Sequence, residues 1–289
     1  MDVQKNKAIR RVVQCFLVFL ALCILEELVI IPHVINTMHL ISSVGGLIVL
    51  LIYIRFINKP LDEIGMIFSG HKVRKGILLA FLLNLAPAAI VYLWEYRILS
   101  LQGGAVFSLY YDKPARSFSS AGPAVFLAWA VACLMISVVE AFFYELSFRG
   151  LLITLGSRSL HFYAINIIQA ALFTVWYLMR WLSLVVYQSD KYTTNQIIYL
   201  LVIILVYEIM TALKLGLLRF STGSVWACIF DHIGFGFIME IVHLNDDSGY
   251  YTRIIAYQAI ALIITYVYYV YKKKKIHEMQ QEAQMQANN

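Results

Sequence analysis

Apolar residues form long runs along this 289-residue chain, and most charged residues stand between the runs rather than within them. A helix needs roughly 20 apolar residues to cross a bilayer core about 30 Å thick. Runs of about that length predict eight membrane-spanning helices, at residues 12–35, 39–57, 76–96, 123–145, 161–187, 195–213, 223–243 and 253–271. The pattern therefore predicts an all-α fold, a polytopic membrane helix bundle.

The composition supports a membrane protein. Hydrophobic residues make up 61% of the chain, charged residues only 14%, and the mean hydropathy is +0.74. In a soluble domain about a quarter of the residues are charged. Because no polar stretch is long enough to form a second domain, we expect one transmembrane domain over residues 12–271, with an N-terminal tail at 1–11 and a basic, polar tail at 272–289.

The distribution of lysine and arginine orients this predicted bundle. With the N-terminus inside the cell, 17 of the 23 basic residues fall on the cytoplasmic side. Cytoplasmic loops carry such an excess, so the bias predicts that both termini are cytoplasmic. The run Lys272–Lys275 predicts contact with anionic lipid, and nothing in the charge pattern requires a nucleic-acid partner.

The cysteines indicate neither a disulfide framework nor a metal site. All four lie inside apolar segments without CxxC spacing, so we interpret them as small core residues: Cys15, Cys23, Cys133 and Cys228. No cofactor or metal is expected, because His232 by itself would supply only one ligand, and one ligand does not make a zinc site.

A few polar residues fall within the predicted spans, where each charge is a functional hypothesis by default. They are Glu26, Glu27, Glu140, Glu145, Arg149, His161, Asp231, His232 and Glu240. Glu145 and Arg149 have the i, i+4 spacing of an intrahelical ion pair, in the favourable order. A structural pair at the cytoplasmic rim and a catalytic pair both remain open. His232 is either hydrogen-bonded to a neighbouring helix or catalytic.

Three segments resemble the motifs of the CPBP family (CAAX-processing and bacteriocin-processing, also called Abi) of eight-helix intramembrane endopeptidases. In chain order they read "YELSFRGLL", "ALFTVWYL" and "GLLRFSTGSVWACIFDHIGFG". The family motifs are EExxxR, then FxxxH, then a histidine followed four residues later by Asn or Asp. The resemblance covers roughly residues 120–240 and implies a peptidase-type site in a bacterial cell membrane, with a role in peptide processing or immunity.

Part of the family's residue set is retained. Glu145 and Arg149 match the second glutamate and the arginine of the first motif. Phe173 matches the phenylalanine of the second motif, and His232 matches the histidine of the third. The resemblance thus implies site roles for Glu145, Arg149 and His232.

The remaining family positions are substituted. Tyr144 replaces the first glutamate, which is expected to polarise water. Tyr177 replaces the second-motif histidine, and Gly236 replaces the Asn or Asp. A phenol with an ordinary pKa near 10 is a poor general base at neutral pH. Glu140, one turn before Tyr144, and Glu240, two turns beyond His232, are alternative carboxylates for the lost position.

The favoured prediction is a peptidase-fold membrane protein with lost or strongly reduced activity that binds a peptide or membrane-protein partner. The first alternative is an active intramembrane endopeptidase, of CAAX or leader-peptide type, that uses Glu145 or Glu140 with His232. The second alternative is a small transporter or channel subunit, which requires a continuous polar path and broken helices at mid-membrane.

Overall fold

A computed structural model describes residues 2–30, 40–104, 107–109, 123–181, 185–186, 193–244 and 250–288. These parts of the chain are almost entirely helical, which confirms the all-α prediction. The longer helices are α1 (Asp2–Leu25), α3 (Leu40–Phe56), α4 (Gly70–Leu101), α6 (Pro123–Tyr144), α8 (Phe162–Met179), α10 (Thr194–Thr222), α11 (Trp226–Ile241) and α12 (Tyr250–Asn288). Shorter elements are the π-helices η1 (Glu26–Ile30) and η2 (Glu145–Leu152), the helix α7 (Ile153–Gly156), and the strands β1 (Phe107–Leu109) and β2 (Val242–Leu244), which pair antiparallel.

Helices lie where the apolar runs predicted them. Within the described residues, five helices are long and apolar enough to cross a membrane, namely Arg10–Ile30, Gly70–Leu101, Phe162–Met179, Thr194–Thr222 and Tyr250–Lys275. Two shorter apolar helices, Ile41–Phe56 and Trp226–Met239, coincide with two further predicted spans. The predicted run 161–187 was too long, because α8 ends at Met179. The count of eight spans stays a prediction.

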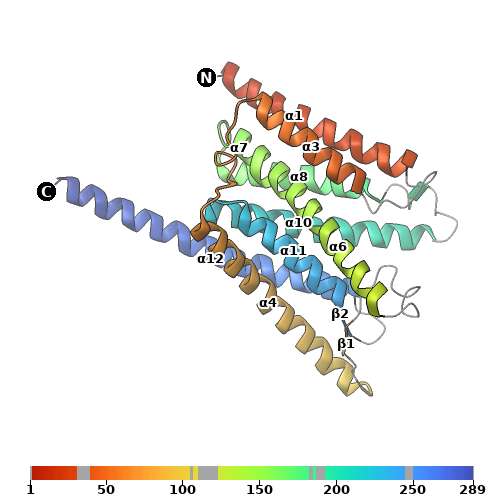
Figure 1. Ribbon diagram of the computed structural model, residues 1–289. Coiled ribbons are helices and arrows are strands. Elements are labelled where there is room, and N and C mark those ends of the chain that lie inside the picture. Colours follow the sequence, from red (N-terminus) through yellow and green to blue (C-terminus); the bar gives the residue numbers. More distant parts are fainter. Residues whose placement is uncertain are drawn as a thin grey trace.

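Helices extend into both predicted tails. Helix α1 begins at Asp2, and α12 continues through the lysine run to Asn288. Figure 1 shows both termini at the same end of the bundle, as the charge bias requires. Which side of a membrane this end faces stays a prediction.

The helices pack as one bundle in which the third motif is central (Figure 1). Helix α11 contacts α4, α6 and α10, and α10 also contacts α8 and α12. Helices α1, α3, α6 and α8 share an apolar core whose largest members are aromatic, including Phe143, Phe148, Phe173 and Trp176. The first motif therefore enters the bundle between this aromatic core and α11.

The first motif lies on the π-helix η2, directly after α6. All eight residues of η2 are buried. The backbone N–H of Ile153 donates to the carbonyl of Phe148, five residues earlier, as expected for a π-helical turn. A side chain at Gly150 would come within 3.3 Å of the Ile64 carbonyl, so the loop before α4 packs directly on the motif. Such π-turns occur frequently at functional sites.

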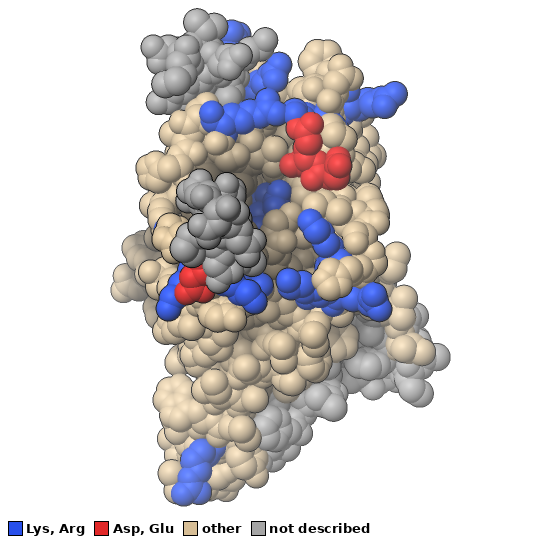
Figure 2. Space-filling model, turned by 90° about the vertical axis from the view of Figure 1, so that its left-hand side faces the viewer, with Lys and Arg blue, Asp and Glu red and all other residues tan. Residues whose placement is uncertain are grey.

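The end of the bundle that carries the termini is strongly basic. Viewed from that end, lysine and arginine side chains surround a hollow, and acidic side chains gather in few places (Figure 2). Arg55 ends α3, Arg74 and Lys75 lie in the first turns of α4, and the Lys272–Lys275 run lies on α12. This arrangement does not test the predicted contact with anionic lipid, which stays a prediction.

Helix α3 offers a sensitive test of the packing, because it contains two adjacent glycines with different surroundings. A side chain at Gly46 would meet the ring of Phe143 on α6 at 2.5 Å, whereas one at Gly45 meets nothing within 4 Å. We expect Gly46→Leu to destabilise the protein by about 1–3 kcal/mol, as overpacked cores do. The measurement is thermal unfolding in detergent micelles, with Gly45→Leu as the matched control. Equal melting temperatures for the two variants would contradict this packing of α3 on α6.

Candidate functional site

The retained motif residues meet at one carboxylate oxygen. Oε1 of Glu145 lies 3.2 Å from Nη1 of Arg149 and 2.9 Å from Nδ1 of His232. Glu145 and Arg149 are fully buried, while the side chain of His232 is 23% exposed. The structure thus joins residues 87 positions apart in the sequence and leaves the histidine open to a ligand.

Arg149 is held from several sides. Its guanidinium carbon lies 4.3 Å from the centre of the Phe173 ring, a cation–π contact with the retained residue of the second motif. Its backbone carbonyl accepts a hydrogen bond of 3.2 Å from Nε of Arg219. The Glu145–Arg149 pair is therefore an internal brace of the bundle and is not exposed to water.

Tyr144 occupies the position of the lost glutamate and is bonded at its hydroxyl. Nη1 of Arg180 donates to this oxygen, and the hydroxyl donates to Oε1 of Glu140 at 3.3 Å. Nη2 of Arg180 also forms an ion pair of 2.8 Å with Glu140. The Tyr144 ring lies 5.5 Å from the ring of His232, centre to centre. The substituted position and the retained histidine are therefore neighbours.

Arg180 lies inside the predicted span 161–187, and the structure buries it. It follows α8 directly, and its side chain is only 9% exposed. The guanidinium lies over the rings of Tyr144, Trp176 and Tyr177, at 5.7, 5.8 and 5.0 Å from their centres. Burial against aromatic rings and an acid explains why this arginine is not at the surface.

The other two substituted positions flank His232. Tyr177 on α8 borders the same cavity as the histidine. Gly236 follows one turn later on α11, and a side chain there would meet nothing within 4 Å. Of the two alternative carboxylates, Glu140 forms an ion pair with Arg180. The side chain of Glu240 lies outside the described part of the structure.

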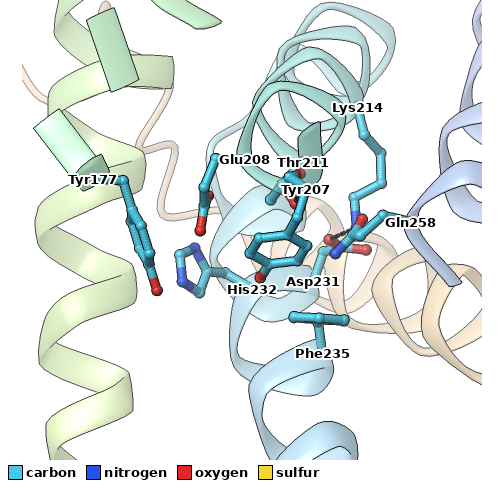
Figure 3. A pocket seen from close by; sticks show the side chains of 9 residues that line it. All are labelled: Tyr177, Tyr207, Glu208, Thr211, Lys214, Asp231, His232, Phe235 and Gln258. Atoms are coloured by element: carbon cyan, nitrogen blue, oxygen red, sulfur yellow. Dashed lines mark hydrogen bonds and ion pairs between the residues drawn. The ribbon is translucent and has the colours of Figure 1, made fainter. Parts of the chain in front are cut away.

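A polar cavity of about 20 Å³ lies beside His232, where α8, α10, α11 and α12 meet. Figure 3 shows its lining, with Tyr177, Glu208 and His232 around one part and Lys214, Asp231 and Gln258 around another. A cavity of this size has room for one water molecule.

Two charged residues of this cavity were missed by sequence reasoning. Glu208 lies inside the predicted span 195–213, and its side chain is 1% exposed. An acidic residue within this apolar run was the signal that could have identified it. Lys214 directly follows the predicted span 195–213, but α10 continues to Thr222 and buries it completely. Its Nζ forms an ion pair of 2.6 Å with Asp231. Asp231 therefore contacts a different neighbour from His232, which contacts Glu145.

Other polar residues from the sequence analysis have local roles. Glu26 accepts hydrogen bonds from the backbone N–H groups of Ile41 and Ser42, at 3.0 and 2.6 Å, so it caps the start of α3. His161 precedes α8 and is exposed. The described residues contain no cluster of three or more His, Cys, Asp or Glu side chains that could hold a metal ion.

Residues 126–238 match a family model described as "Type II CAAX prenyl endopeptidase Rce1-like". This range contains all three motifs and the cavity residues up to His232, and the match confirms the resemblance drawn from the motifs. No curated protein matches the chain.

Proposed function

We propose that this chain, of which residues 126–238 match the Rce1-like CAAX prenyl endopeptidase family model, is a membrane protein of that family with lost or strongly reduced peptidase activity. It retains a polar site that binds a peptide or a partner membrane helix. One observation carries the loss of activity. The water-activating position holds Tyr144, whose hydroxyl is bonded to both Glu140 and Arg180.

The chemistry of hydrolysis explains why this arrangement matters. A general base must lie within about 3 Å of the water it activates. Tyr144 supplies no base at neutral pH, and the nearest displaced carboxylate, Glu140, is neutralised by Arg180 at 2.8 Å. Where the family has a glutamate that activates water, this chain has Tyr144. The nearest carboxylate, Glu140, lies one helical turn earlier in an ion pair with Arg180.

The binding part of the proposal rests on what is kept. Glu145 and Arg149 still brace η2, and Glu145 still orients His232 through Nδ1. The imidazole remains partly exposed beside a polar cavity. These features suit a site that recognises a peptide without cleaving it rapidly.

A test compares binding with cleavage in the purified protein in lipid nanodiscs. We expect a fluorescent farnesylated CAAX peptide to bind, measured by anisotropy, while chromatography detects turnover no faster than a slow residual rate. A leader-type peptide serves as the second substrate. Robust turnover that Glu145→Ala abolishes would refute the proposal, and so would failure to bind either peptide.

The active-endopeptidase alternative has one observation in its favour, the 2.9 Å contact between Glu145 and His232. Against it, the same carboxylate oxygen is shared with Arg149, and Glu140 is held by Arg180. The Glu145→Ala comparison decides between the two. Nothing among the described residues singles out the transporter alternative, which stays a prediction.

A further inference from the structure

A carboxylate that belongs to no family motif lies in the cavity beside His232. Glu208 comes from the middle of α10 and is 1% exposed. Its Oε1 is buried and has no hydrogen-bond partner among the described residues. Figure 3 shows its carboxylate pointing toward the imidazole of His232, with Tyr177 on the other side of the ring. A buried carboxylate without a partner is costly, so its position requires an explanation.

The other buried charges around the cavity are compensated by partners of opposite sign. The pairs are Arg149 with Glu145 at 3.2 Å, Lys214 with Asp231 at 2.6 Å, and Arg180 with Glu140 at 2.8 Å. Glu208 has no ion-pair partner in the part of the chain that the structure describes. The titratable side chains beside it in the cavity include His232, Tyr177 and Tyr207.

Glu208 and His232 face the same cavity. Glu145 occupies Nδ1 of the ring at 2.9 Å, which leaves Nε2 for a ligand. A carboxylate and an imidazole at one cavity can supply a general base and a hydrogen-bond donor at the same site.

The cavity can hold the third participant, a water molecule. Its volume of about 20 Å³ exceeds the 10–15 Å³ that one water needs. Gln258 also borders it, and both polar atoms of this fully buried side chain have no partner among the described residues. A water in the part of the cavity beside His232 would give the unpartnered Oε1 of Glu208 a hydrogen bond, since a buried water typically makes two to four of them.

We propose that Glu208 and His232 form a relocated hydrolytic couple, which acts on a peptide amide bond through the water in this cavity. The inference rests on the proposed function, because it supplies the residual activity that the substituted motif positions would not. The proposed base thus lies on α10. The family motif instead places the base at position 144, at the end of α6.

The reaction balances with water as the only co-reactant. The carboxylate of Glu208 accepts a proton from the water while the water oxygen bonds to the peptide carbonyl carbon. The Nε2–H of His232 donates a hydrogen bond to the resulting oxyanion. The carbon–nitrogen bond then breaks, the amine leaves with the proton from Glu208, and a carboxylic acid and an amine are released.

The test measures slow cleavage of the farnesylated CAAX peptide by the full-length protein in nanodiscs. We expect Glu208→Gln, which keeps the side-chain shape, to lower the residual rate by at least about 100-fold, the usual contribution of a general base. Glu63→Gln, a change to an exposed glutamate at the basic end, should leave the rate unchanged. His232→Gln should also lower the rate, and the double variant should be no slower than the slower single variant, because both residues act in one step.

Each outcome separates this inference from the proposed function. A wild-type rate equal to spontaneous hydrolysis would refute the relocated couple and leave the inactive binding protein intact. A residual rate that Glu208→Gln does not change, in a variant with unaltered melting temperature and peptide binding, would refute it as well. Robust wild-type turnover that depends on Glu208 would support the couple and refute the reduced activity.

Discussion

Replacing Arg149 with methionine is expected to lower the free energy of unfolding by about 3–5 kcal/mol, the usual cost of breaking a buried ion pair from one side. Arg149 is fully buried, so the substitution leaves the Glu145 carboxylate inside the bundle without its cation. It also removes the cation–π contact of 4.3 Å to Phe173. The measurement is thermal unfolding in micelles, where the melting temperature should fall by on the order of 10 °C.

Two variants complete this experiment. Lys59 and Glu63 have the same i, i+4 separation, but the glutamate is 45% exposed. Lys59→Met should therefore cost no more than about 1 kcal/mol. Adding Glu145→Gln to Arg149→Met should recover much of the loss, because no unpaired charge then remains. A fall for Arg149→Met as small as that for Lys59→Met would show that the brace does not stabilise the bundle.

Restoring the three substituted positions is expected to raise peptidase turnover by at least about 100-fold over wild type. The variant combines Tyr144→Glu, Tyr177→His and Gly236→Asn. Glutamate and histidine are smaller than the tyrosines they replace, and a side chain at Gly236 meets nothing within 4 Å. The gain is expected because a positioned general base contributes about 100-fold to 10,000-fold. The measurement is cleavage of the farnesylated CAAX peptide in nanodiscs.

The matched control for this gain places glutamine instead of glutamate at Tyr144, with the other two changes retained. It has the same shape but no base, so its turnover should stay near the wild-type rate. If the restored protein folds and binds the peptide yet gains no activity, the substituted positions are not what limits catalysis.

Helix positions could be predicted well because each apolar run carries its own signal. A run of about 20 apolar residues favours a spanning helix whatever surrounds it. Helix ends were less accurate, as at Met179 and Lys214. The sequence did not show that Arg180 and Lys214 are buried in the bundle, because a basic residue at the end of an apolar run resembles a loop residue in sequence alone.

The candidate site was predicted in part. Motif spacing identified Glu145 and His232, which the structure joins at 2.9 Å. The ion pair between Glu140 and Arg180 was not predicted, because the two residues are 40 positions apart on different elements. Glu208 was overlooked because it belongs to no motif, and only the packed structure shows it beside His232 without an ion-pair partner among the described residues.

The sequence by itself determined the membrane character, the helical fold and the family resemblance, and it predicted the loss of a carboxylate at position 144. These features follow from local composition and residue identity. Only the tertiary structure decided which charges are compensated and which buried carboxylate faces the retained histidine. Ion pairing depends on distances of about 3 Å between side chains from different helices, and such distances arise only when the helices pack.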